Sequence, residues 1–84
     1  MNYKEYLFDH GMSNPEVSIA EGTAAAEGES IAKTLGVRFI GYWDEISKFL
    51  FNDDNETGTS FAAKDLDEAR QKLKQKRKEF LAYA

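Results

Sequence analysis

The chain has 84 residues, which allows one domain with one modest core, and its 42% hydrophobic and 31% charged residues are typical of a folded domain. It contains no cysteine and a single histidine, His10, which excludes disulfides, cysteine-ligated metal sites and a multi-histidine metal site within one chain. We therefore expect no metal and no cofactor, and oligomerisation is the one remaining way to reinforce so small a fold.

Charge is unevenly distributed along the sequence. The net charge is −4, made up of −7 for the residues up to Ala63 and +3 from Lys64 onward. An acidic body followed by a basic segment can attract partners of either sign.

The N-terminal segment Met1–His10 lacks the basic start and apolar centre of a signal peptide. No apolar run reaches the roughly 18–20 residues that span a bilayer. These features predict a cytoplasmic protein that does not contact membranes.

Two helices are predicted in the first part of the chain. The first covers Tyr3–Asp9, with Asn2 as its cap and Gly11 as its stop. The second begins at the capping box Ser13–Glu16 and runs to about Leu35.

Two glycines interrupt the second predicted helix. Gly22 and Gly28 each cost about 1 kcal/mol of helix propensity relative to alanine, which leaves a break near Gly22 open. Gly28 lies on the apolar stripe of this helix, where it predicts a close approach of the helix to a sheet.

Three strands are predicted next, over about Val37–Trp43, Ile46–Asn52 and Thr59–Ala62. This region concentrates six of the eleven aromatic residues of the chain: Phe39, Tyr42, Trp43, Phe49, Phe51 and Phe61. Alternation of apolar and polar residues between turn-forming clusters is typical of an antiparallel sheet.

Both faces of the predicted sheet are partly apolar. Strict alternation places one set of side chains together on the first face: Phe39, Gly41, Trp43, Phe49, Phe51 and Phe61. The opposite face then carries Ile40, Tyr42, Ile46 and Leu50.

The last predicted helix starts near Asp65, whose carboxylate can cap it with Glu68 at the third position. Its predicted buried stripe is Leu66, Ala69, Leu73 and Phe80. The whole chain, residues 1–84, is thus predicted to be a single small α+β domain of order α-α-β-β-β-α. In this domain a three-stranded antiparallel meander packs against two longer helices plus a short N-terminal helix.

Apolar side chains on both sheet faces lead to the main functional hypothesis. Ile40, Tyr42, Trp43 and Leu50 are the candidate contact residues for a protein partner, because an exposed aromatic beside aliphatic side chains is typical of a binding hot spot. The alternative is that a helix covers this face. The first hypothesis describes a non-catalytic protein-binding module, with self-association into a homodimer through the free face or an edge strand.

The second hypothesis is nucleic-acid binding. On a helical wheel, Arg70, Lys74, Arg77 and Lys78 form one basic ridge that could contact several phosphates. The alternative is a solvated helix end, which the acidic remainder of the chain favours.

The remaining motifs do not predict a metal site or a catalytic site. Asp53–Gly58 begins like a calcium loop, but Lys64 occupies the twelfth position, where the bidentate glutamate is required, so a hairpin turn is the better interpretation. No recognisable nucleophile motif accompanies His10, so the sequence does not predict a catalytic triad. We assign no catalytic residues, and an enzyme would need a concave pocket that holds carboxylates of perturbed pKa.

Overall fold

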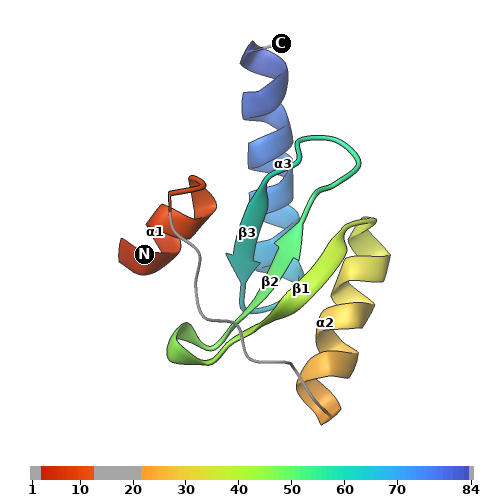
Figure 1. The fold of residues 1–84 in the computed structure, drawn as a ribbon. Helices are drawn as coiled ribbons and strands as arrows, with labels where there is room; N and C mark the ends of the chain where they lie inside the picture. The colour runs from red at the N-terminus through yellow and green to blue at the C-terminus, as the bar shows by residue number, and fades with distance from the viewer. Residues whose placement is uncertain (1–2, 13–21, 84) are drawn as a thin grey trace.

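A computed structural model describes residues 3–12 and 22–83, and the side chains of 3–12 and 22–82. The elements are α1 (Tyr3–Asp9), α2 (Gly22–Leu35), β1 (Arg38–Trp43), a 3-10 turn (Asp44–Ile46), β2 (Lys48–Asn52), β3 (Ser60–Ala63) and α3 (Leu66–Tyr83). The strands form one antiparallel sheet of order β1-β2-β3, which confirms the predicted fold class (Figure 1). None of the described helices is both long and apolar enough to cross a membrane.

The sheet is covered on both faces. On one face, α2 and α3 pack over Phe49, Phe51 and Phe61. On the other face, Phe8 of α1 packs over Leu50, and α1 lies beside β3, far from α2 (Figure 1). Of the two alternatives for the second face, the structure therefore shows the covered one.

The prediction of which β1 side chains share a face is wrong for Tyr42 and Trp43. Phe39 pairs with Phe51, but Gly41 pairs with Leu50, so one extra β1 residue stands between two consecutive partners. Such a bulge reverses the side-chain alternation that follows it. Tyr42 consequently packs on the α2/α3 face and Trp43 on the α1 face.

Gly28 allows α2 to lie directly on β1, as predicted. A Cβ atom at this position would lie 2.4 Å from a ring carbon of Phe39, closer than carbon atoms can approach without a shift. Gly22 has a positive φ of 61°, which a helix interior does not accommodate, so the described helix begins there. The predicted capping box Ser13–Glu16 and the predicted cap Asn2 lie outside the described residues.

The start of α3 is capped as predicted. The backbone N–H of Glu68 donates to Asp65 Oδ1 at 2.8 Å. The carboxylate of Glu68 in turn accepts a hydrogen bond from the backbone N–H of Lys64 at 3.3 Å. These bonds satisfy donors that the helix itself cannot pair.

The short helix α1 is attached by charges as well as by Phe8. The carboxylate of Glu5 is almost fully buried and forms ion pairs with Lys48 and, at 3.3 Å, with Lys72. Lys72 Nζ also lies 2.9 Å from Asp9 Oδ2. Burial acts to raise the pKa of Glu5, but the hydrogen bonds and charges of Lys48 and Lys72 outweigh it and hold that pKa below its ordinary value of 4.5.

The same charges occupy the free edge of β3. The backbone N–H of Ala62 donates to Asp9 Oδ1 at 3.2 Å, and the carbonyl oxygen of Ala62 accepts from Lys72 Nζ at 2.6 Å. Side chains thus take the place of a neighbouring strand at this position, which closes part of the edge to strand addition.

Candidate interaction surface

The four residues predicted to contact a protein partner are not brought together on one surface. Leu50 is 0% exposed and Trp43 only 4%, since both lie beneath α1. Tyr42 is half-buried on the opposite face, with its ring 5.3 Å from that of Phe49. Ile40 is the one member with a substantial exposed fraction, 36%.

The predicted basic ridge is reduced from four cations to three. Arg77 is engaged in the fold, because its guanidinium makes two hydrogen bonds of 3.0 Å to the buried carboxylate of Asp53. Arg70, Lys74 and Lys78 remain exposed along α3.

Asp53 acts as a clamp between the β2–β3 turn and α3. Its carboxylate binds Arg77, and its backbone carbonyl accepts from the N–H of Gly58 at 2.8 Å, closing the β2–β3 turn. The hydrogen bonds from Arg77 hold the pKa of the Asp53 carboxyl below its ordinary value of 3.8. The clamp fixes this turn against α3, and the turn then becomes one wall of the concavity described next.

A concavity of about 410 Å³ lies where the end of α1, the start of β3 and the second half of α3 meet. We call it the α1/α3 groove; its lining residues are Phe8, Asp9, His10, Gly11, Thr57, Gly58, Thr59, Ser60, Lys76, Glu79 and Phe80. Its volume falls within the range of ligand pockets.

The apolar wall of the groove is formed by Phe80. This side chain is 48% exposed, although the sequence predicted it within the buried stripe of α3. The reason is length: the 18 residues of α3 span about 27 Å, whereas the four residues of β3 span about 13 Å. The last turns of α3 therefore extend past the sheet that covers its earlier part (Figure 1).

A second concavity of about 340 Å³ lies on the other side of Phe80. It is lined by Glu56, Thr57, Arg77, Phe80 and Leu81, and we call it the turn-side groove. Leu81 is 73% exposed. The end of α3 thus presents two large apolar side chains between two concavities.

The polar wall of the α1/α3 groove carries an unusual lysine. Lys76 is half-buried, and its Nζ donates to the backbone carbonyl of Asp9. Burial lowers the pKa of Lys76 from its ordinary value of 10.5. The charges of Asp9 and Glu79 act in the opposite direction, but they do not offset the effect of burial on this pKa.

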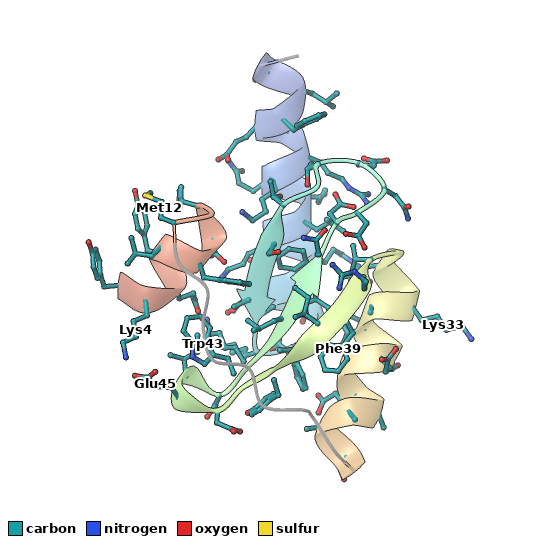
Figure 2. All side chains as sticks on the ribbon, viewed as in Figure 1. Lys4, Met12, Lys33, Phe39, Trp43 and Glu45 are labelled. Atoms are coloured by element: carbon teal, nitrogen blue, oxygen red, sulfur yellow. The ribbon has the colours of Figure 1, made fainter. Side chains whose placement is uncertain are left out.

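His10 closes the α1 end of the groove. Its Nδ1 lies 2.7 Å from the backbone carbonyl of Tyr6, and because a carbonyl only accepts, Nδ1 carries the proton. The ring also stacks on Tyr6 with centroids 4.2 Å apart. Both contacts tie His10 to the last turn of α1. Met12, which follows it, is exposed at the end of the α1 segment (Figure 2).

The buried carboxylates of the described residues lie away from the groove. The two buried carboxylates of the described residues, Glu5 and Asp53, are ion-paired, have lowered pKa values, and do not line the groove. The described part of the chain also contains no cluster of three or more His, Asp or Glu side chains placed to hold a metal ion.

Comparison with known protein families, with curated proteins and with solved structures finds no match for this chain.

Proposed function

We propose that this chain is a non-catalytic protein-binding module, and that its contact surface is the α1/α3 groove together with the end of α3. The observation that carries the proposal is the exposure of Phe80 and Leu81 on a helix end flanked by two concavities. Large apolar side chains beside a pocket and rimmed by polar groups are typical of protein-contact hot spots.

This proposal moves the contact surface from the residues that the sequence suggested. Leu50 and Trp43 serve to attach α1, so a partner cannot reach them while α1 is in place. The proposed class of function, a protein-binding module, stays the same. Only the location of the contact surface differs, because Phe80 and Leu81 are exposed whereas Leu50 and Trp43 are buried.

Photo-crosslinking tests the location. A photoreactive amino acid placed at Leu81 should give discrete protein adducts in lysate of the source cells, identified by mass spectrometry. The matched control is the same amino acid at Lys33, which is exposed on a different helix, α2. Adducts that occur equally from both positions, or from neither, would contradict the proposal.

Nucleic-acid binding is the second candidate, supported by the exposed cations Arg70, Lys74 and Lys78 on one side of α3. The test is a triple charge reversal of these three residues to glutamate, which spares the structural Arg77. Binding of the wild type to single- and double-stranded oligonucleotides should fall steeply with salt and be lost in the variant. A wild type that binds neither oligonucleotide at low salt would eliminate this candidate.

A further inference from the structure

We infer that the α1/α3 groove binds a short extended peptide segment of a partner protein, which adds to the edge of β3 beside Ser60. The inference rests on the proposed function, since it states what kind of partner occupies the same surface. One residue of the segment exchanges two backbone hydrogen bonds with Ser60, and side chains of the segment contact the aromatic walls of the groove.

The backbone groups of Ser60 point out of the sheet. The N–H of Asp53 donates to the carbonyl oxygen of Thr59 at 2.9 Å, and the next pair in the register is Asn52 with Ser60. Hydrogen-bonded and non-hydrogen-bonded pairs alternate between antiparallel strands, so the N–H and C=O of Ser60 point away from β2. They face outward, because β3 is an edge strand (Figure 1).

Ala62 supports this alternation independently. It lies two residues after Ser60, and its N–H and C=O also point outward, where they bond to Asp9 and Lys72. Side chains of α1 and α3 thus satisfy the edge at Ala62. Within residues 3–12 and 22–83, no side chain bonds to the N–H or C=O of Ser60, which lines the groove.

A backbone donor and acceptor on one residue of a sheet edge match the backbone of another extended chain. An antiparallel segment satisfies both with a single residue, which suits an edge that Asp9 and Lys72 close at the following outward position. The interior of a helix cannot do so, because its backbone groups are already bonded to one another. The exposed pair at Ser60 therefore favours an occupant in extended conformation.

The walls of the groove predict the side chains of the segment. Paired residues on neighbouring strands point to the same face, and successive residues point to opposite faces. Ser60 shares the α1 face with Ala62, so the residue paired with Ser60 points to the side where Phe8 lies. The residue next to it points to the other face, where α3 carries Phe80. We expect two adjacent apolar residues in the segment.

Selection from a library of linear heptapeptides displayed on phage tests the inference with the intact chain. Enriched peptides should share two adjacent apolar residues, and Phe80→Glu should weaken their binding at least about tenfold. Ile40→Glu, at an exposed position on the other edge strand, should change the dissociation constant less than about twofold. No enrichment, or enriched peptides that are indifferent to Phe80→Glu, would overturn the inference.

Proline at position 60 tests the hydrogen bonds. Proline lacks the N–H and is tolerated on an edge strand where that group points outward, so Ser60→Pro should fold and bind an enriched peptide at least about tenfold more weakly. Ser60→Ala keeps the N–H and is the matched control, with an expected change below about twofold. Equal affinities of two folded variants would contradict backbone pairing at Ser60.

N-methylation of an enriched peptide tests the same bonds with the wild-type chain, and it decides the question if Ser60→Pro does not fold. Methylation of the one residue that donates to the carbonyl of Ser60 should weaken binding at least about tenfold. Methylation of either neighbouring residue should have a much smaller effect, because their N–H groups point away from β3. Equal effects at all three positions would exclude an added strand.

Amide hydrogen exchange locates the bound peptide. Exchange at Ser60 should slow at least about tenfold when the enriched peptide binds, whereas exchange at Ala62, which is already bonded to Asp9, should change little. An unchanged exchange rate at Ser60 in a saturated complex would place the peptide elsewhere and overturn the inference.

Failure here is distinguishable from failure of the proposed function. Adducts from Leu81 without enrichment of any linear peptide would retain the binding module and overturn the extended segment. Slowed exchange at Ser60 without adducts from Leu81 would support the peptide site and contradict only the extension of the contact surface to the end of α3.

Discussion

The face of the sheet beneath α2 and α3 is packed by rings and aliphatic side chains, whereas the face beneath α1 combines a few apolar side chains with alternating charges. On the first face, Phe51 and Phe61 are fully buried and their rings lie 5.5 Å apart. On the second, Glu5 and Lys72 connect α1 to α3 across the edge of β3. The first face supplies non-directional stability, and the second fixes a helix too short to be stable alone.

This difference predicts that the two faces fail in different ways. Loss of an aromatic side chain should unfold the whole domain. Loss of a charge beneath α1 should release α1 while the rest of the sheet remains. Trp43 is the only tryptophan of the chain and packs edge-on against Phe8 at 5.7 Å, so its fluorescence reports whether α1 is attached.

Phe51→Ala should have the largest effect. It removes a fully buried ring from the centre of the aromatic face, which costs about 3–5 kcal/mol. A domain of this size has about 4–12 kcal/mol of total stability, so urea unfolding should shift to much lower concentration or the chain should unfold outright. The control is Phe80→Ala, the same change at an exposed position, with an expected loss below about 1 kcal/mol. If Phe51→Ala and Phe80→Ala lowered the free energy of unfolding equally, the contrast between the buried core and the exposed end of α3 would be wrong.

Glu5→Gln should come next, with a loss of about 2–4 kcal/mol, because it leaves the ammonium groups of Lys48 and Lys72 partly buried without their shared anion. The emission of Trp43 should shift to longer wavelength while circular dichroism retains most of the helix content. Glu45→Gln, at an exposed ion pair with Lys4, is the charge-matched control and should leave the emission unchanged. An unshifted emission in Glu5→Gln would show that these charges do not hold α1.

Acid should separate the two faces in the wild type. The pKa of Glu5 is lower in the folded chain than its ordinary value of 4.5, so its ion pairs stabilise the fold above that pH and lose this contribution as pH falls below it. The contribution of Asp53 is lost in the same direction. We expect Trp43 fluorescence to change at higher pH than the loss of sheet structure, and Glu5→Gln to remove that early step. Coincident transitions in the wild type would contradict separate release of α1.

The aromatic face could be predicted from the sequence because its information is local. Alternation and turn residues identified all three strands, and Asp65 identified the start of α3, because each signal lies within a few positions of the structure that it specifies. The exchange of Tyr42 and Trp43 between faces could not be predicted, since the bulge at Ile40 depends on pairing with β2 and not on the sequence of β1 alone.

The attachment of α1 and the groove were missed for different reasons. Asp9 and Lys72 are 63 positions apart, and many other acid–base pairs in the chain would have been equally plausible. The exposure of Phe80 had a usable signal: an 18-residue helix is about twice as long as the strand on which it packs, so its last turns must extend beyond the sheet.

Asp53→Asn tests the charged pair that holds the β2–β3 turn against α3. It removes the anion that binds Arg77 within a buried turn, and we expect a loss of about 1–3 kcal/mol with little change in Trp43 emission, because α1 is not involved. Asp54→Asn, the next residue and half exposed, should leave the urea midpoint nearly unchanged. If Asp53→Asn and Asp54→Asn lowered the free energy of unfolding equally, the stabilisation would come from negative charge at this turn in general and not from the Asp53–Arg77 pair.

Gly28→Ala should have the smallest effect, because two contributions oppose each other. Alanine gains about 0.5–1 kcal/mol of helix propensity, but its Cβ would lie 2.4 Å from the ring of Phe39, and overpacking of this kind costs about 1–3 kcal/mol. We therefore expect a net loss of about 1 kcal/mol by urea unfolding. The double variant Gly28→Ala/Phe39→Leu should show coupling, with alanine less destabilising once the ring is gone. A strictly additive pair would mean that α2 can move away from β1 at no cost, and the close packing of the aromatic face would then not depend on this glycine.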